Sequence, residues 1–325
     1  MSKPLVAVSD SVFPNLDLAR AALSEVEAEL RLADEPTPEA ILAVAREADG
    51  MLVTYAQITG DMIRQLSRCR IIARFGIGVD NVDIEAATEA GIVVTKVPDY
   101  CIDEVSDHAL ALLMALARKI PFSNQLVHGG EWKLPAVAPL YRLRGRTLGL
   151  VGFGQIPRML APKAQALGIR VVAYDPYVPE EAMAAVQVEQ VDLDALLQVS
   201  DYISVHAPLT PDTHHMFDRE AFRRMKPGAL LINTARGPLV DEQALVEALN
   251  NGELAGAALD VREQEPPPAD SALRGRTDVI LTPHTAFYSV EALEDLQTKA
   301  TQEVVRVLRG ERPRNPLNPE VLESA

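Results

Sequence analysis

Short apolar runs rich in β-branched residues recur along the chain and alternate with longer helical patterns. Apolar strands that alternate with helices are typical of parallel sheets covered by helices. The predicted fold class is therefore α/β, with two doubly wound parallel-sheet domains. The runs occupy 5–8, 51–54, 70–74, 92–95, 148–152, 171–175, 202–207, 229–234, 257–261 and 279–283, and helical patterns occupy 102–120, 157–168, 240–250 and 289–309.

The domain boundaries follow from the order of these patterns. The chain has 325 residues, 48% of them hydrophobic, which is enough for two medium cores. The last helix, 289–309, follows the final strand of the second sheet and could return to the first domain. We therefore predict a discontinuous domain of residues 1–101 and 290–325, with a second domain, 102–289, inserted in it.

Composition excludes several function classes. The net charge of −15 disfavours nucleic-acid binding, because an acidic surface repels phosphate backbones. The two cysteines, Cys69 and Cys101, have no metal-ligand spacing and make no disulfide framework, so we expect small buried side chains and no metal. The N-terminus lacks a secretory apolar core, and the apolar helix at 108–120 is too short to span a bilayer. A reduced, soluble, cytoplasmic protein is predicted.

A glycine turn joins a buried strand to a helix in the stretch LGLVGFGQIPR, residues 148–158. This context is the one that a dinucleotide-binding turn requires. Gly152 would permit the tight turn, and Gly154 would let the backbone approach a pyrophosphate. The N–H groups of Gln155 and Ile156 would face the phosphates at the helix N-terminus.

Pro157 stands where a third glycine is expected. That glycine serves helix packing, and proline is tolerated in a first helical turn, so the site remains compatible with a dinucleotide. Asp175 ends the next strand, where an acid takes the ribose hydroxyls and repels a 2′-phosphate, so NAD is the predicted cofactor. The alternative is a glycine turn and a surface aspartate in a fold without a dinucleotide.

Three later strands break into polar loops that carry Arg236, Glu265 and His284. Histidine can exchange the hydroxyl proton of an alcohol near neutral pH, and a carboxylate on its other nitrogen fixes the tautomer. An arginine can hold a substrate carboxylate with two hydrogen bonds. Singly, each residue could equally be a surface ion pair, a solvated acid or a loop histidine. Their joint occurrence beside the glycine turn favours an active site.

Six motifs carry a resemblance that covers nearly the whole chain: RFGIGVDNVDIEAATEAGIVVTKVPDY, RTLGLVGFGQIPR, HAPLTPDTHHMF, MKPGALLINTARGPLVDEQAL, GAALDV and LTPHTAFYS. In order and spacing they resemble those of the D-isomer-specific 2-hydroxyacid dehydrogenases. The stretches YDPY, NTARG and PHTAFYS look closest to the C-terminal-binding-protein branch. The resemblance implies a flavodoxin-like substrate domain and a Rossmann NAD-binding domain.

The resemblance also implies roles for individual residues. Arg236 would bind the substrate carboxylate and carbonyl, His284 would be the acid/base, and Glu265 its partner. Backbone amides around Ile77 and Gly78 would hold the substrate carboxylate from the first domain. The family further implies a homodimer through the nucleotide domain and closure of the two lobes around substrate.

Other implied positions would contact the cofactor. Asp260 would reach the nicotinamide carboxamide. The remaining residues line the cofactor from strand-end loops: His206, Ala207, Pro208, Thr213, Thr234 and Ala235, besides Arg236 and His284.

The chain departs from the family pattern in places. Arg262 replaces an aromatic residue of many members and is expected to face solvent; the alternative is an inward-pointing side chain that adds positive charge near the site. Phosphoglycerate enzymes usually present Arg-Ser for the phosphate where this chain has Thr54-Tyr55-Ala56, which argues against a phosphorylated substrate. The chain ends soon after its last helix, so no C-terminal regulatory domain is expected.

Several other features have ordinary structural interpretations. The pair His214-His215 is expected to form a turn and not a metal site. We expect His108 to be a packed or interface histidine. Trp132 is expected to be a packing anchor near the cleft, with a substrate contact as the alternative. The acidic stretch 181–194 is expected to be a solvated face.

Two functions compete at this point. The leading one is an oxidoreductase that transfers a hydride between NAD(H) and a small D-2-hydroxy acid or 2-keto acid. The rival is an NAD-sensing dimeric scaffold of the C-terminal-binding type that recruits peptides. A non-redox use of NAD has no support in the sequence. Neither the substrate side chain nor the physiological direction is encoded.

Overall fold

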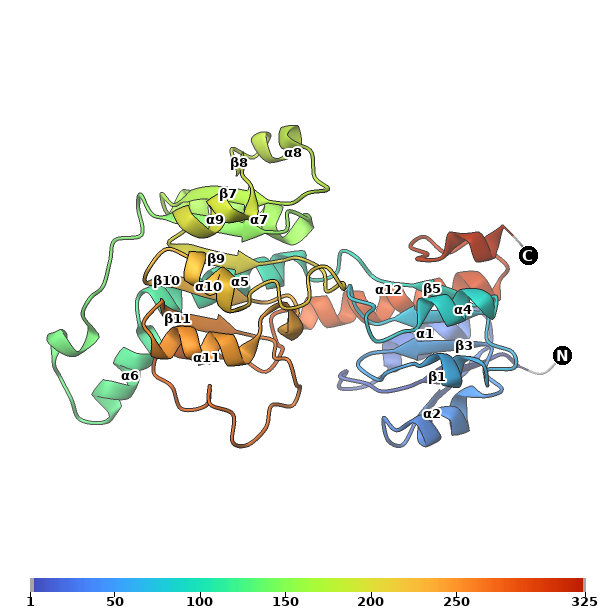
Figure 1. Cartoon of the computed structure of the whole chain (residues 1–325). Coiled ribbons are helices and arrows are strands. Elements are labelled where there is room, and N and C mark those ends of the chain that lie inside the picture. Colours follow the sequence, from blue (N-terminus) through green and yellow to red (C-terminus); the bar gives the residue numbers. More distant parts are fainter. Residues whose placement is uncertain (1–2, 324–325) are drawn as a thin grey trace. The chain divides into compact units, whose positions relative to one another are not determined.

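The computed structural model describes residues 3–323, which belong to two compact units (Figure 1). Unit 1 comprises Met1–Tyr100 and Ser289–Ala325, and unit 2 comprises Cys101–Tyr288. The chain passes from one unit to the other twice, after Tyr100 and after Tyr288. Each of these boundaries lies one residue before the predicted one. Each unit is an α/β body with its own parallel sheet, which confirms the predicted fold class.

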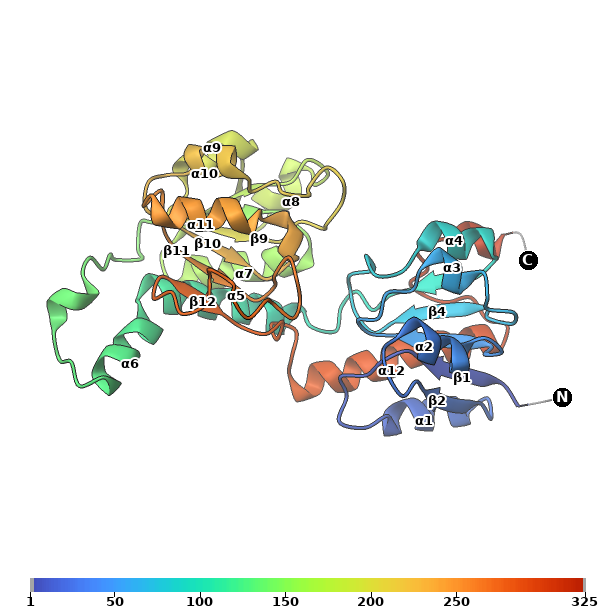
Figure 2. The same ribbon diagram turned by 60° about the horizontal axis from the view of Figure 1, so that its bottom comes forward.

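Unit 1 contains a five-stranded parallel sheet in the order β2-β1-β3-β4-β5. Flavodoxin-like folds have this order, with their topological switch point between β1 and β3. Helices α2, α3 and α4 cover one face, and α1 and α12 lie together on the other (Figure 2). The elements are β1 (Leu5–Val8), α1 (Asp17–Ser24), β2 (Glu29–Leu32), α2 (Pro38–Ala45), β3 (Gly50–Val53), α3 (Gly60–Ile63), β4 (Ile71–Arg74), α4 (Ile84–Glu89), β5 (Val93–Thr95), α12 (Val290–Leu308) and η3 (Pro319–Leu322).

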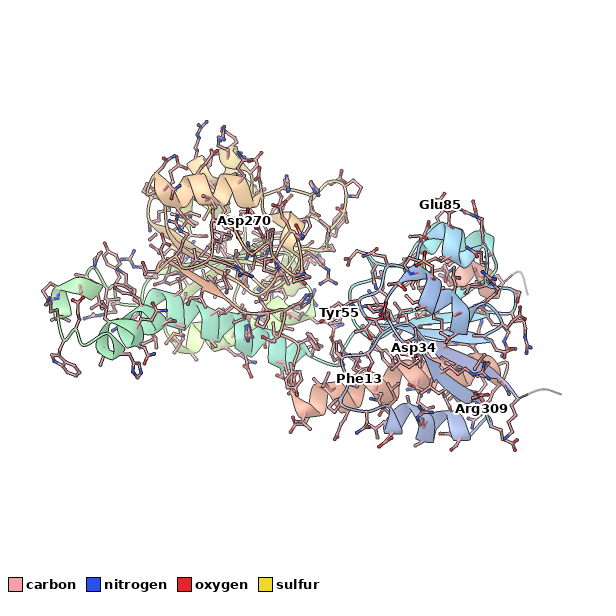
Figure 3. All side chains as sticks on the ribbon, turned by 90° about the horizontal axis from the view of Figure 1, so that it is seen from below. Phe13, Asp34, Tyr55, Glu85, Asp270 and Arg309 are labelled. Atoms are coloured by element: carbon pink, nitrogen blue, oxygen red, sulfur yellow. The ribbon has the colours of Figure 1, made fainter. Side chains whose placement is uncertain are left out.

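The C-terminal segment belongs to unit 1. Helix α12 packs against α1 and under β3 and β4. Arg309, labelled in Figure 3, directly follows this helix and pairs with Glu25 at 2.7 Å. Beyond it, the buried Asn318 accepts the Val94 N–H at 2.8 Å. This bond satisfies a backbone donor on the edge strand β5.

Unit 2 contains a seven-stranded parallel sheet in the order β12-β11-β10-β9-β6-β7-β8. Its order reverses between β6 and β9, which is the topological switch point where ligands bind in open α/β sheets. The elements are α5 (Ile102–Ala117), α6 (Ile120–His128), η1 (Leu134–Val137), β6 (Thr147–Val151), α7 (Gln155–Ala166), β7 (Arg170–Tyr174), α8 (Glu180–Ala184), β8 (Glu189–Gln190), α9 (Leu193–Val199), β9 (Tyr202–Val205), α10 (Arg219–Arg224), β10 (Ala229–Asn233), η2 (Gly237–Leu239), α11 (Glu242–Asn250), β11 (Leu254–Leu259) and β12 (Val279–Leu281).

Side chains of the unit 2 strands alternate between two cores because successive residues point to opposite faces of a sheet. Leu148 and Leu150 belong to the core under α5 and α7. Val151 belongs to the core formed with α9, α10 and α11. Helices on both faces explain why the strands read as continuous apolar runs.

Some predicted elements differ from the observed ones. The helix predicted at 102–120 is two helices, because Lys119 adopts a left-handed φ of +50° between α5 and α6. Strands β2 and β8 were not predicted, since their sequences ELRL and EQ lack an apolar run. No helix within residues 3–323 combines the length and apolar character needed to cross a membrane.

Candidate active site

The glycine turn lies at the switch point of the unit 2 sheet, between β6 and α7. Gly152 has a φ of +88°, and a Cβ there would lie 2.8 Å from the backbone N of Ala207. Any side chain would therefore push the turn off the end of strand β9. Gly154 has no neighbour within 4 Å of a Cβ position, so the space beside it is open to a ligand.

Helix α7 begins without a side-chain cap. Its N-cap is Gly154, whereas α9, α10 and α11 are each capped by an aspartate that accepts an N–H of the first turn. The first intrahelical bond joins the Arg158 N–H to the Gly154 carbonyl. The N–H groups of Gln155 and Ile156 precede it and point out of the helix end, where an anion is favoured.

Pro157 is buried at the third position of α7. It has no N–H to donate, and no intrahelical acceptor exists for that position, so it fits the first turn. The proline therefore replaces the third glycine without removing a phosphate donor. A second proline, Pro162, lies exposed inside the same helix.

Asp175 follows strand β7 and braces the glycine turn. One carboxylate oxygen accepts the Phe153 N–H at 2.8 Å, and the other accepts the Tyr177 N–H at 2.9 Å. The sequence did not predict this bracing. A carboxylate offers about four acceptor positions, so these two bonds leave it able to accept ribose hydroxyls as well. The ribose contact remains a prediction.

The loop after β10 is shaped by the buried Asn233. Its Oδ1 accepts the Ala235 N–H at 3.0 Å, and its Nδ2 donates to the Arg236 carbonyl at 2.8 Å. These bonds fold residues 233–236 back on themselves and present Arg236 at the carboxyl edge of the sheet. The hydroxyl of Thr234 is buried and has no hydrogen-bond partner among the described residues. That orphaned hydroxyl suits a position that contacts a bound cofactor.

Glu265 and His284 form a hydrogen-bonded pair. The Nδ1 atom of His284 lies 2.7 Å from Oε2 of Glu265, and the second oxygen, Oε1, accepts the Arg262 N–H at 2.8 Å. Burial raises the pKa of Glu265, but the bond to His284, the Arg262 N–H and the charge of Arg236 outweigh burial and lower it. The other two predicted head groups, His284 and Arg236, therefore both act on the Glu265 carboxylate.

The buried Asp260 holds the turn that carries His284. Its Oδ1 accepts the Thr285 N–H and its Oδ2 the Ala286 N–H, both at 2.9 Å. Its backbone carbonyl accepts the His284 N–H at 2.8 Å, and His284 itself has a left-handed φ of +52°. A left-handed histidine held by a buried carboxylate is the kind of backbone feature that clusters at functional sites. Contact of Asp260 with a nicotinamide remains a prediction.

The loop after β9 contacts the glycine turn through its backbone. The His206 N–H donates to the Val151 carbonyl at 2.7 Å, and its Nε2 lies 2.8 Å from the Ser204 hydroxyl. Burial lowers the pKa of His206 to about 3, so this histidine is neutral and supplies no charge. Further along, the Thr213 hydroxyl donates to the Pro208 carbonyl at 2.7 Å and stiffens the loop.

Two predictions about surface residues are wrong. Arg262 does not face solvent: it is 6% exposed, and its Nε and Nη2 atoms donate to the Glu242 carboxylate. Trp132 is not a packing anchor: it is 87% exposed, on a segment outside both cores of unit 2.

Other interpretations agree with the structure. His108 is partly buried, with Nε2 3.1 Å from the Thr282 hydroxyl. Cys69 and Cys101 are both buried, and burial raises the pKa of Cys69 to about 12. His215 pairs with Glu263 at 2.5 Å and stacks on His214.

Ile77 and Gly78 lie in unit 1, in the half-buried loop after β4. Nothing in the geometry of that unit tests their predicted role, which stays a prediction.

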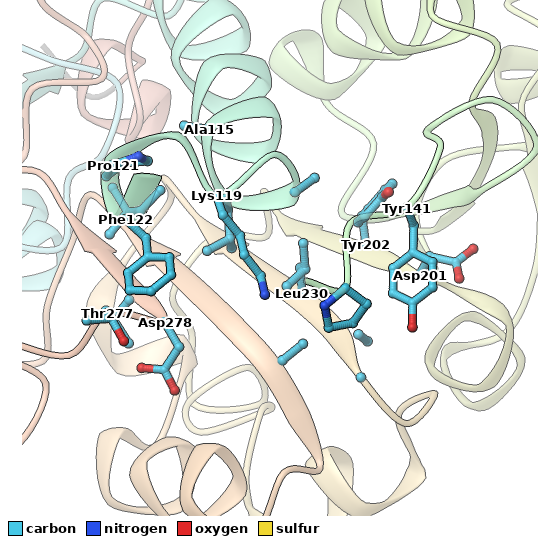
Figure 4. Close-up of a pocket in the computed structure, with 18 of the residues that line it drawn as sticks. Ala115, Lys119, Pro121, Phe122, Tyr141, Asp201, Tyr202, Leu230, Thr277 and Asp278 are labelled. Atoms are coloured by element: carbon cyan, nitrogen blue, oxygen red, sulfur yellow. The ribbon is translucent and has the colours of Figure 1, made fainter. Parts of the chain in front are cut away.

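A separate hollow of about 580 Å³ lies at the amino edge of the unit 2 sheet. The first residues of β9 and β10, Tyr202 and Ala229, line it together with Lys119, Phe122 and Tyr141 (Figure 4). It contains none of the predicted site residues. The hollow and the reactive loops therefore occupy opposite edges of one sheet.

Comparison with known proteins agrees with this geometry. Residues 110–286 match the family model of the D-isomer specific 2-hydroxyacid dehydrogenase NAD binding domain. A glyoxylate reductase of Korarchaeum cryptofilum is 37% identical over 96% of this chain and 97% of its own length. A D-3-phosphoglycerate dehydrogenase of Methanocaldococcus jannaschii is 39% identical over 89% of this chain, which spans only 55% of that enzyme. The structure of an Aquifex aeolicus D-lactate dehydrogenase with NAD and lactic acid is 27% identical, with a TM-score of 0.85 over 98% of both chains.

Proposed function

Because the chain belongs to the D-isomer-specific 2-hydroxyacid dehydrogenase family, we propose that it transfers a hydride between NAD(H) and a small D-2-hydroxy acid or its 2-keto acid. The observation that carries this proposal is the 2.7 Å contact between His284 and Glu265, with the charge of Arg236 beside it. This set lies at the carboxyl edge of the sheet that also holds the glycine turn. The turn, with its open N–H groups, fits a pyrophosphate.

Each residue has a distinct part in the reduction of a 2-keto acid. The Arg236 guanidinium binds the substrate carboxylate through two hydrogen bonds and orients the carbonyl. The cofactor, when bound, supplies the hydride that reduces the carbonyl carbon. His284 donates a proton to the carbonyl oxygen, so the product is the neutral alcohol and the imidazole is left neutral. Glu265 stabilises the protonated imidazole before transfer and fixes the ring orientation.

The cofactor preference rests on Asp175. Its carboxylate is fixed by the Phe153 and Tyr177 N–H groups at the end of β7, where the adenosine ribose of a dinucleotide lies in this fold. A fixed negative charge there would repel a 2′-phosphate. NAD is therefore expected to bind more tightly than NADP. In the Asp175→Ala variant the difference between the NAD and NADP affinities is expected to be smaller.

The substrate is proposed to be small and unphosphorylated, as the name of the glyoxylate reductase relative suggests. Thr54 and Tyr55 stand where phosphoglycerate enzymes usually present Arg-Ser. Their N–H groups already donate to the Asp10 carboxylate, at 3.0 and 2.6 Å. A fixed carboxylate and the absence of a cation in residues 54–56 disfavour a phosphate group.

A homodimer is proposed through the segment 119–141 of unit 2. Helix α6 has no buried residue, and large apolar side chains along the segment are exposed: Ile120 by 58%, Val127 by 50%, Trp132 by 87%, Leu134 by 82% and Tyr141 by 57%. Exposed apolar groups on this scale mark an association surface. The hollow at the amino edge of the sheet adjoins the segment, and a second copy of the chain is its proposed occupant. Light scattering of a Trp132→Ser/Leu134→Ser variant is expected to show monomers.

A panel of 2-keto acids with NADH tests the enzymatic proposal. Consumption of NADH with at least one small acid is expected. Tight NADH binding without turnover of any acid would instead favour the scaffold function, which the dehydrogenase and reductase relatives do not favour. A special likeness to the C-terminal-binding-protein branch and a cytoplasmic location both remain predictions.

A further inference from the structure

Arg262 is a buried arginine at a position where many members of the family carry an aromatic residue. It follows strand β11 and is 6% exposed. Its Nε and Nη2 atoms donate to the two carboxylate oxygens of Glu242, both at 2.7 Å, and Nη2 also donates to the Ser271 hydroxyl at 3.0 Å. Glu242 is the first residue of helix α11. A bidentate pair therefore ties the loop after β11 to the start of a core helix.

The same loop is held through its backbone. The Glu263 N–H donates to Glu242 at 3.0 Å, and the Glu242 N–H donates back to Glu263 at 3.1 Å. The Arg262 N–H, next to these bonds, donates to Oε1 of Glu265 at 2.8 Å. The loop also packs on Gly237, where a Cβ would come within 1.9 Å of the Arg262 carbonyl. Together these contacts fix the direction of the Arg262 N–H, which donates to Glu265.

We propose that the Glu242–Arg262 pair is a positioning element that aims the Glu265 carboxylate at His284. The inference rests on the proposed dehydrogenase function, in which Glu265 orients the acid/base histidine. Side-chain bonds from Arg262 fix its own backbone, and that backbone holds one oxygen of Glu265. The second oxygen then has a single direction, toward Nδ1 of His284.

The energetics favour a geometric role over a purely stabilising one. A buried ion pair is often no more stabilising than a well-packed hydrophobic replacement, because both charges must be removed from water. What it adds is directional, since a bidentate pair fixes two parallel bonds. An aromatic residue could fill this position without holding the loop by hydrogen bonds. The inferred benefit of the pair is therefore the orientation of Glu265.

The pair also affects the ionisation of Glu265. Burial raises the pKa of this carboxyl, and the groups that face it and lower the pKa are His284, the Arg262 N–H and the Arg236 charge. If the loop moves, the Arg262 N–H no longer stabilises the carboxylate. The pKa of Glu265 then rises, and the acid limb of the pH–rate profile moves to higher pH.

The double substitution Glu242→Gln/Arg262→Met tests the proposal. It removes both charges, so neither is left buried without its partner, as each single substitution would do. With NADH and the best keto acid of the panel, kcat is expected to fall about tenfold to a hundredfold, as expected when a catalytic group is misaligned. KM and NADH affinity should stay unchanged. The acid limb of the pH–rate profile should move to higher pH.

Glu247→Gln provides the matched control. Glu247 lies on the same helix α11 and pairs with Arg219, but has no hydrogen bond to the loop after β11. Its kcat and pH profile should match those of the unsubstituted protein. Thermal unfolding of each variant shows whether the fold is retained.

A carbon-13 NMR titration of labelled glutamate side chains, assigned with Glu265→Gln, follows the Glu265 carboxyl without any turnover. A higher pKa of Glu265 in the double variant supports the proposal. An unchanged kcat, pH profile and Glu265 pKa would overturn it. Absence of turnover in the unsubstituted protein would overturn the proposed function alone, and the titration would still decide whether the pair positions Glu265.

Discussion

The two sheets of this protein have switch points of the same kind and use them in opposite ways. In unit 2, strand β6 is followed by Gly152-Phe153-Gly154, and no side chain caps the next helix, α7. In unit 1, strand β1 is followed by Ser9-Asp10. The Asp10 carboxylate accepts the N–H groups of Thr54 and Tyr55, beyond the neighbouring strand β3, as well as the Ser9 hydroxyl at 2.5 Å.

The difference shows how one architecture provides two kinds of carboxyl edge. We call the edge of the unit 1 sheet closed and the edge of the unit 2 sheet open. Backbone N–H groups at the carboxyl edge of a parallel sheet favour an anion. In unit 1 the chain supplies that anion itself, through Asp10. In unit 2 the Asp175 carboxylate accepts the Phe153 N–H, but no side chain caps helix α7, so the N–H groups of Gln155 and Ile156 remain for a ligand. The fold is shared, and the residues at the edge decide the function.

The largest expected effect is on kcat, and it comes from a substitution at the open edge that leaves cofactor binding intact. His284→Ala should lower kcat by a factor of about 10²–10⁴, because the proton donor is lost. NADH affinity should change little, since the glycine turn is intact. Steady-state kinetics and NADH fluorescence titration measure the two effects. Retained turnover would remove His284 from the mechanism.

A second test compares the two glycines of the open edge. Gly152→Ala is expected to destabilise unit 2 and abolish NADH binding, because a Cβ at φ +88° would come 2.8 Å from the Ala207 N. Gly154→Ala should fold normally, since no atom lies within 4 Å of its Cβ position, yet bind NADH about tenfold more weakly. Thermal unfolding and calorimetric titration distinguish the two variants. Equal NADH affinity of Gly154→Ala and the unsubstituted protein would contradict a close approach of the pyrophosphate.

A third test addresses the closed edge. Asp10→Asn should lower the free energy of unfolding by about 1 kcal/mol, because one of the two N–H groups of Thr54 and Tyr55 loses its acceptor. NADH affinity should not change. Chemical denaturation measures the first quantity and fluorescence titration the second. If the substitution leaves the stability unaltered, Asp10 does not close this edge.

The smallest expected effect is a dependence on pH. Since the pKa of Glu265 is lowered in the fold, its pairing with His284 is fully present above the ordinary glutamate value of about 4.3 and is lost as pH falls through the lower folded value. Below about pH 4.3, the Glu265→Gln variant should therefore lose less stability on acidification than the unsubstituted protein. Thermal unfolding temperatures from pH 3 to 6 check this, and parallel curves for both proteins would argue against it.

Part of the candidate site could be chosen from the sequence. Gly152, Asp175 and the trio of Arg236, Glu265 and His284 could be chosen because each follows an apolar strand, and parallel strands end at the same edge of a sheet. The role of Asn233 could have been inferred in the same way, as a polar residue that ends a buried run. For Arg262 no local signal existed, since an arginine after a strand is usually solvated.

What the sequence by itself determined is the alternation of strands and helices, the two sheets that follow from it, and the residue types at the strand ends. Local periodicity and turn chemistry suffice for these, because they act over a few residues.

Only the tertiary structure decided which strand ends are open and which side chains hold the reactive loops. The pairs that do so are far apart in the chain: Asp10 and Thr54 are separated by 44 positions, and Glu242 and Arg262 by 20. Their bonds require loops from different strands to be placed within a few tenths of an ångström. Packing of the whole unit sets that placement, and no short stretch of sequence encodes it.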